Sequence, residues 1–248
     1  MRRLACFALL AALVHAGAAG GEAPPAPIFI NARINPGNLP YADFYATQQL
    51  LRSYLPAEPR VIDLRLRLSF TELAGEQRDE YAAGDWGVAI VGDTVDHTVA
   101  MAKGGYFLLP DLPRAVDEHA TVMFKTQTRK NYVEAAWMLK EGPGNTLAYA
   151  DFARALDEVA ALQKKIPWYR PELRDERLAR FDALKACFAD AGGRMEIDGK
   201  PVPTTRRGRC ALLRFDPAQA GKHASAIAFV GKLENLSLGL IDPASPAQ

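Results

Sequence analysis

The chain is poor in the residues that carry most hydrolytic chemistry, with five serines, four histidines and three cysteines among 248 residues. No serine stands in a G-x-S-x-G or S-x-x-K motif, and no H-E-x-x-H pair of zinc-binding histidines occurs. Cys-x-x-Cys is also absent and the histidines are scattered, so we expect no metal and no cofactor. These absences do not exclude an enzyme, but they favour a non-enzymatic protein.

The chain also lacks a charge excess of either sign. Its 30 basic and 29 acidic residues argue against a nucleic-acid partner, which would require a basic surface. One apolar run stands out, from Leu4 to Val14, preceded by Arg2 and Arg3 and followed by small residues. This three-part pattern is typical of a secretory signal and is too short to span a bilayer. We predict a signal peptide at 1–18, a periplasmic or secreted location, and no transmembrane segment in the mature chain.

The mature chain keeps two cysteines, Cys187 and Cys210. In an exported protein such a pair predicts a disulfide, because the compartment is oxidising. The closed loop of roughly 24 residues corresponds to a stabilisation of about 3.5 kcal/mol in the chain-entropy model. A metal site is the alternative, but the sequence offers it no partner ligands.

Proline and glycine divide the mature chain. Residues 19–27 have the small-residue and proline composition of a flexible arm, and Glu141-Gly142-Pro143-Gly144-Asn145 interrupts any regular element. We therefore predict a first repeat at 28–140, a linker at 141–145, a second repeat with the disulfide at 146–242, and a tail at 243–248.

The halves on either side of this linker resemble each other. Tyr41-Ala42-Asp43-Phe44 opens a helical stretch that stops at Leu55-Pro56, and Tyr149-Ala150-Asp151-Phe152 opens one that stops at Ile166-Pro167. The core-facing residues recur at helical spacing. They are Tyr41, Phe44, Gln48 and Leu51 in the first half and Tyr149, Phe152, Leu156 and Val159 in the second.

Short apolar strands continue the parallel. The segments 88–91, 106–109 and 120–124 correspond to 195–197, 210–213 and 224–229, so Tyr106 aligns with Cys210. We predict an α+β fold of two tandem repeats, each a helix packed on a small antiparallel β-sheet or sandwich. Chance similarity between short apolar strands is the alternative.

Two local patterns predict individual strands. Ile62 to Phe70 alternates apolar with charged or polar residues, which indicates a half-buried antiparallel strand with Arg65 and Arg67 on its polar face. Asp198-Gly199 predicts a tight hairpin, and Pro201 places the returning strand at an edge. Leu173 to Phe188 is ambiguous, and we favour a helix that passes into a short strand around 184–188.

Several residues are candidates for function. Asp93, Asp96 and His97 could form an acid/base group, although neighbouring strand residues point to opposite faces and turn chemistry explains Asp93. Asp43 and Asp151 could line a shared site, but first-turn acids also stabilise a helix N-terminus.

Basic and aromatic residues give two further candidates. Arg65 and Arg67, with Arg129-Lys130 and Arg206-Arg207, could contact anions or carbohydrate, or could simply be solvated. Trp168, with Trp137 and Tyr169, could form an aromatic surface or cap the core.

The overall layout resembles bacterial exported proteins of unknown function. Separately, Val88 to Asp93 followed by Gly104 to Pro113 is similar to the strand, turn and G-x-F-x-L-x-x-L-P pattern of carboxypeptidase-regulatory-like, transthyretin-type sandwiches. That similarity covers about 30 residues and implies a non-catalytic β-sandwich module without naming its ligand.

The sequence therefore predicts a non-enzymatic periplasmic binding or envelope-associated accessory protein, whose partner is an unknown envelope protein or small ligand. The alternative is a secreted hydrolase with a site between the two repeats, where clefts commonly form. A deep polar pocket favours the hydrolase and a flat surface favours the binding module.

Overall fold

The computed structural model describes residues 38–73, 75–125, 131–170, 173, 180–220 and 225–241, all within one compact unit. The predicted signal peptide at 1–18, the arm at 19–27 and the tail at 243–248 lie outside the described residues.

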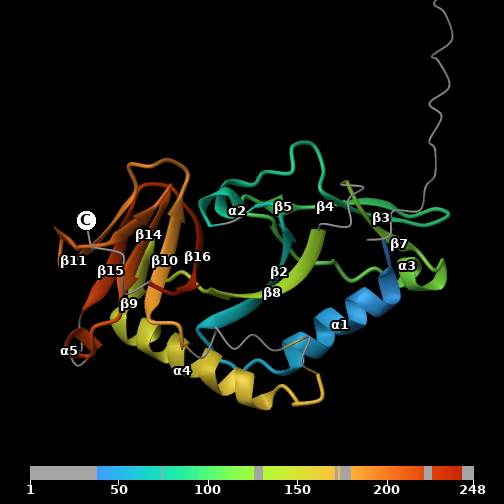
Figure 1. Cartoon of the computed structure of the whole chain (residues 1–248). Helices are drawn as coiled ribbons and strands as arrows, with labels where there is room; N and C mark the ends of the chain where they lie inside the picture. The colour runs from blue at the N-terminus through green and yellow to red at the C-terminus, as the bar shows by residue number, and fades with distance from the viewer. Residues whose placement is uncertain are drawn as a thin grey trace, which may run out of the picture. The chain divides into compact units, whose positions relative to one another are not determined.

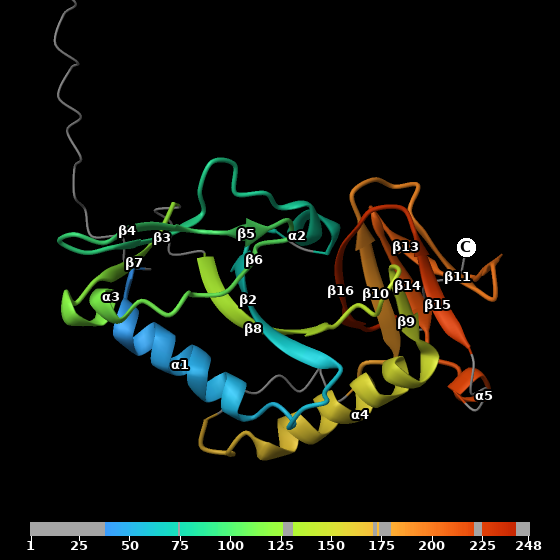
Figure 2. The ribbon, with the colours of Figure 1, turned by 180° about the vertical axis from the view of Figure 1, so that it is seen from behind.

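The described residues form five helices: α1 (Tyr41–Ser53), α2 (Glu76–Glu80), α3 (Pro113–Asp117), α4 (Tyr149–Lys165) and α5 (Pro217–Ala220). The two long helices, α1 and α4, begin at the tyrosines of the two Tyr-Ala-Asp-Phe motifs, as predicted. They lie along the same side of the strands in both views of the ribbon (Figures 1 and 2). Both contact strand β2 (Ile62–Phe70).

The strands form three antiparallel sheets, which confirms the α+β class. The first sheet contains β1 (Leu39–Pro40), β7 (Thr121–Phe124), β3 (Val88–Val91) and β4 (Asp96–Val99), in that order. The third contains β12 (Lys200–Pro201), β11 (Arg194–Ile197), β15 (Ala226–Val230) and β9 (Thr146–Ala148).

The second sheet is the longest and crosses both halves of the chain. Its order is β13 (Thr205–Arg207), β14 (Cys210–Arg214), β10 (Ala183–Phe188), β16 (Leu233–Gly239), β8 (Asn131–Leu139), β2, β6 (Tyr106–Phe107) and β5 (Met101–Ala102). The halves meet where β16 pairs with β8, at Ser237 opposite Met138. We call this junction the seam.

The pairing order is the same in the two halves. The first sheet runs β1-β7-β3-β4, and the third, read from its other edge, runs β9-β15-β11-β12. The long sheet reads β5-β6-β2-β8 from one end and β13-β14-β10-β16 from the other. Residues that pair across strands also match between the two sheets. Leu39 lies opposite Val122 as Leu147 lies opposite Ile227. Likewise, Val88 lies opposite Phe124 as Met195 lies opposite Phe229.

A tyrosine anchors each long helix. The Tyr41 hydroxyl accepts a hydrogen bond from the Leu112 backbone N–H (2.9 Å), and the Tyr149 hydroxyl accepts one from the Asp216 N–H (2.8 Å). Both rings are buried, and both backbone donors lie directly before a short helix, α3 or α5. The buried phenol oxygens thus each accept a bond from a partly buried backbone N–H.

Strand β2 differs from its predicted half-buried state. Leu66 to Ser69 are buried on both faces, and Arg67 is only 9% exposed. The reason is that Arg67 is covered by Tyr106 and by Asp79 of α2, neither of which the alternating pattern of β2 reveals. Arg65 does remain exposed, as predicted.

Two other local predictions are confirmed. Asp198 and Gly199, both at positive φ, join β11 to the edge strand β12, which contains Pro201. The expected short strand at 184–188 is β10, while most of the helix expected before it lies outside the described residues. Among the described helices, none has the length and apolar character needed to cross a membrane.

Replacing either anchor tyrosine with phenylalanine should destabilise the fold, and more so at Tyr41, whose hydroxyl also donates a hydrogen bond to the Pro110 carbonyl (2.7 Å). Tyr41→Phe and Tyr149→Phe each leave one backbone N–H without its acceptor, which costs about 1–3 kcal/mol in free energy of unfolding. Urea unfolding of both variants measures this loss. Tyr169→Phe is the control, because that ring is 65% exposed. A loss for only one of the two anchors would contradict their equivalence.

Candidate functional site

Helix α2 places a buried carboxylate against the second half of the chain. Asp79 is 5% exposed and accepts hydrogen bonds from Arg67 of β2 (3.0 Å) and from Lys185 Nζ of β10 (2.6 Å). Its backbone carbonyl accepts a bond from Arg209 (2.6 Å). We call Asp79, Arg67, Lys185 and Arg209 the Asp79 cluster. It connects the halves beside the seam.

A glycine turn fixes Arg67 within this cluster. Gly104 and Gly105 both have positive φ, and a Cβ on Gly105 would lie 2.4 Å from the Leu68 carbonyl oxygen. This close approach exposes the Gly104 carbonyl to Arg67 Nε, which donates to it at 2.9 Å. The guanidinium then lies 4.9 Å from the ring centroid of Tyr106.

A tight hairpin brings two further arginines to the seam. Strands β13 and β14 are joined by Gly208 and Arg209, with Arg207 directly opposite Cys210. Gly208 has a φ of +56°, which suits a two-residue hairpin turn. Arg209 is buried and pairs with Glu80 and Glu234. The side chain of Arg207 has no ion pair or hydrogen bond among the described residues, whereas its backbone pairs with Cys210.

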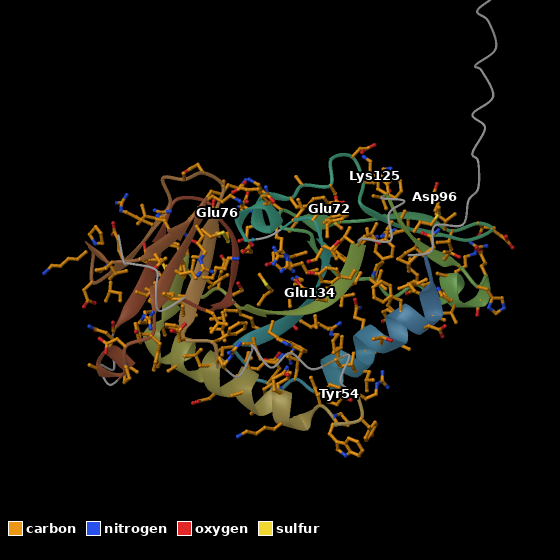
Figure 3. All side chains as sticks on the ribbon, viewed as in Figure 1. Tyr54, Glu72, Glu76, Asp96, Lys125 and Glu134 are labelled. Atoms are coloured by element: carbon orange, nitrogen blue, oxygen red, sulfur yellow. A yellow bond between two sulfur atoms is a disulfide. The ribbon has the colours of Figure 1, made fainter. Side chains whose placement is uncertain are left out.

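A second polar group completes the site from the first half. Arg78 of α2 pairs with Glu134 of β8 and donates to the Ser69 hydroxyl (2.9 Å), which in turn donates to Glu134 (3.0 Å). Glu134 lies near the middle of the side chains drawn in Figure 3. Arg78 Nε is buried and has no hydrogen-bond partner in the described part of the chain.

Several of these residues line a pocket of about 250 Å³ that we call the seam pocket. Its polar lining comes from both halves: Arg67, Arg78, Tyr106 and Glu134 from the first, and Lys185, Arg207 and Ser237 from the second. Its apolar lining includes Trp137, Met138, Phe181, Leu212, Leu238 and Leu240. Four of the seven polar residues are cations, so the pocket is suited to hold negative charge.

Burial shifts two ionisable groups in the pocket. It lowers the pKa of Lys185 below its ordinary value; Asp79 opposes that shift, while Arg67 and Arg207 add to it. Burial also raises the pKa of Tyr106, so its phenol stays protonated at neutral pH. Perturbed groups gathered in a cleft are a common property of functional sites.

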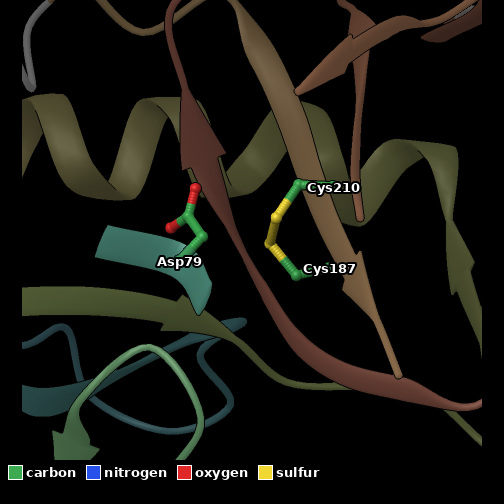
Figure 4. A group of neighbouring side chains, drawn as sticks. All are labelled: Asp79, Cys187 and Cys210. Carbon is green, nitrogen blue, oxygen red and sulfur yellow. A yellow bond between two sulfur atoms is a disulfide. The ribbon is translucent and has the colours of Figure 1, made fainter. Parts of the chain in front are cut away.

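The cysteine pair lies beside the Asp79 side chain (Figure 4). Cys187 and Cys210 are opposed residues of β10 and β14, and their sulfurs are 1.99 Å apart, a disulfide distance. The carboxylate of Asp79 and both sulfurs lie within 4.8 Å of one another. In a disulfide neither sulfur is a thiolate, and Asp79 already binds two cations, so this group is poorly suited to a metal ion.

Two other pockets among the described residues are larger but have fewer charged residues in their linings. One, of about 400 Å³, is lined mainly by apolar residues around Phe44 and Phe124, and Asp43 is its one charged residue among those that line it. The other, of about 450 Å³, is lined by 82–87 and 98–103, with Asp85 and Lys103 as its charged residues. Neither has a cluster of several cations in its described lining, as the seam pocket does.

The structure brings together only some of the candidates chosen from sequence. Arg67 and Arg207 meet in the seam pocket, whereas Arg65 lies outside its lining and Arg129-Lys130 lie outside the described residues. Asp96 and His97 are exposed on the edge strand β4, and Asp93 is exposed in the turn before it.

The remaining candidates lie apart from the pocket. Asp151 pairs with Arg154 one helical turn later, and Asp43 is exposed on α1. Trp168 is 81% exposed after α4, whereas Trp137 is buried in β8, so these tryptophans do not form one aromatic surface.

Sequence reasoning missed Asp79, Arg78, Glu134 and Lys185. Asp79 and Arg78 stand in the charged stretch Glu76-Gln77-Arg78-Asp79-Glu80, which has the composition of a solvated segment. Glu134 and Lys185 are charged residues within strands and have no motif around them. No local signal indicates that these four residues meet.

Comparisons with known proteins add no family to this description. No family model matches the chain, and no match was found among curated proteins or among solved structures.

Asp79→Asn should destabilise the protein by about 3–5 kcal/mol, because it leaves the buried cations Arg67 and Lys185 without a counter-charge. Urea unfolding provides the measurement. The matched control is Asp85→Asn, which removes a carboxylate from the exposed pair with Lys125 and should leave stability nearly unchanged. Equal effects of the two substitutions would refute the structural role of Asp79.

Proposed function

We propose that the chain is an exported, non-enzymatic binding protein that holds a small ligand in the seam pocket. The observation that carries this proposal is the pocket lining, which combines four cations from both halves with an apolar wall. Ligand sites commonly combine an apolar surface with a few convergent polar groups. An envelope protein remains the alternative partner.

The hydrolase is the second candidate, because a polar pocket between the halves is the feature expected of it. Glu134, Tyr106 and Ser237 are the groups in the lining that could act in proton transfer or attack. Glu134 is neutralised by Arg78, burial raises the pKa of the Tyr106 phenol, and the described lining residues include no histidine to activate Ser237. Binding therefore fits this lining better than hydrolysis does.

We also propose that the chain is one helix-plus-sheet unit present twice. The equal pairing orders, the equal registers and the two tyrosine anchors support this. Under this alignment the opposed pair Arg67 and Tyr106 corresponds to the opposed pair Cys187 and Cys210. The ligand pocket would then lie between two related units.

The proposal of export is supported by the charged and apolar pattern of residues 2–14 and by the disulfide distance of the cysteine pair. Protein purified from the periplasm or medium should begin after residue 18, which N-terminal sequencing determines. Its intact mass should rise by two hydrogens on reduction, as a single disulfide requires. Two free thiols in the unreduced protein would contradict this, as would an intact N-terminus in the cytosol.

A panel of amino acids, sugars, organic acids and phosphate esters separates binding from turnover. We expect at least one compound to raise the unfolding midpoint, because a ligand that binds only the native state stabilises it. Mass spectrometry should recover that compound unchanged. Turnover that disappears in Glu134→Gln would favour the hydrolase instead. Absence of any midpoint shift would reject a small ligand.

A further inference from the structure

We infer that the ligand of the seam pocket is a small organic dianion, with its acidic head on Arg207, Arg78 and Lys185 and an apolar body on Trp137 and Phe181. This inference rests on the proposed binding function and names its ligand class.

Charge balance is the first argument. Four cations line the pocket, whereas two carboxylates contact them: Glu134 pairs with Arg78, and Asp79 binds both Arg67 and Lys185. Among the described residues, the four lining cations thus exceed the carboxylates that contact them by two. A ligand with two negative charges would neutralise this excess. Because the pocket is partly buried, the attraction between the opposite charges is stronger there than in water.

Unused hydrogen-bond donors are the second argument. The Arg207 side chain lines the pocket with no ion pair or hydrogen bond among the described residues, and Arg78 Nε is buried without a partner there. A guanidinium presents several N–H donors in a plane, which matches the oxygens of a carboxylate or phosphate group. These two arginines therefore have N–H donors that no described residue uses and that could bind an acidic group of a ligand.

The size and walls of the pocket are the third argument. A volume of about 250 Å³ is larger than an inorganic anion needs, and Trp137, Phe181 and Leu212 form an apolar part of the lining. An organic body attached to the acidic head would fill this part. Phosphomonoesters and dicarboxylates share this chemistry, so both are tested.

Isothermal titration calorimetry on the mature protein, with its disulfide intact, tests the inference with four probes. Phenyl phosphate and phthalate carry both a dianionic head and an apolar body, inorganic phosphate carries the head alone, and benzylamine carries the body with a positive charge. We expect phenyl phosphate or phthalate to bind more tightly than phosphate, and benzylamine not to bind. Tighter binding of phenyl phosphate indicates a phosphate ester, and tighter binding of phthalate a dicarboxylate.

Arg207→Gln should weaken the tighter probe roughly 10- to 100-fold, the range for loss of one charge-assisted hydrogen bond. Folding should be preserved, since the Arg207 side chain has no hydrogen-bond or ion-pair partner among the described residues. Arg65→Gln removes the same charge from an exposed site outside the pocket lining and should leave affinity unchanged. Equal effects of the two variants, or no binding of any anion, would overturn the inference. If a neutral compound from the panel binds the wild type and Arg207→Gln equally well, the dianion inference is wrong but the proposed binding function stands.

The pH dependence provides an independent readout. Lys185 faces Asp79 of α2, Arg67 of β2 and Arg207 of β13, and its burial lowers its pKa. It therefore loses its proton at a lower pH than a free lysine does, so affinity for phthalate should already fall as the pH rises toward the ordinary pKa of a lysine. Arg207→Gln should bind less tightly throughout but keep this fall. Affinity independent of pH over this range would remove Lys185 from the site.

Discussion

The buried carboxylate of Asp79 holds together the part of the molecule where the two halves meet. It accepts hydrogen bonds from a cation of each half, Arg67 and Lys185, and its backbone carbonyl accepts a third from Arg209. Without it, these positive charges would face one another in a region of low dielectric constant, where repulsion is strong. The short helix α2 is thus the element on which the arrangement of the seam depends, although it contains only Glu76–Glu80.

The same arrangement explains why a cationic pocket can form there. Asp79 and Glu134 neutralise enough charge for the cluster to pack, but Arg207 remains outside both pairs. The tight β13–β14 turn keeps Arg207 next to the cluster by placing it opposite Cys210. Structure and binding capacity therefore have the same origin, which is the excess of pocket-lining cations over the carboxylates that contact them.

The sequence predicts the local elements of this fold well, because their signals are local. Both Tyr-Ala-Asp-Phe helices, the Asp198-Gly199 hairpin and strand β2 follow from periodicity and turn chemistry. The seam could not be predicted, because β8 and β16 show no such signal and their pairing joins residues far apart in the chain. For the same reason Arg67 and Arg207 were recognisable only as separate basic residues, and Asp79 had the composition of a solvated segment.

The two-residue connection between β13 and β14 makes this hairpin intolerant of change in length. Gly208 adopts a backbone conformation that other residues rarely reach, and one added residue would shift β13 against β14 so that Arg207 moved to the opposite face. The segment between Pro201 and Thr205, by contrast, lies outside any strand. Insertions and deletions during evolution should therefore accumulate in that segment and be absent from the Arg207–Cys210 turn.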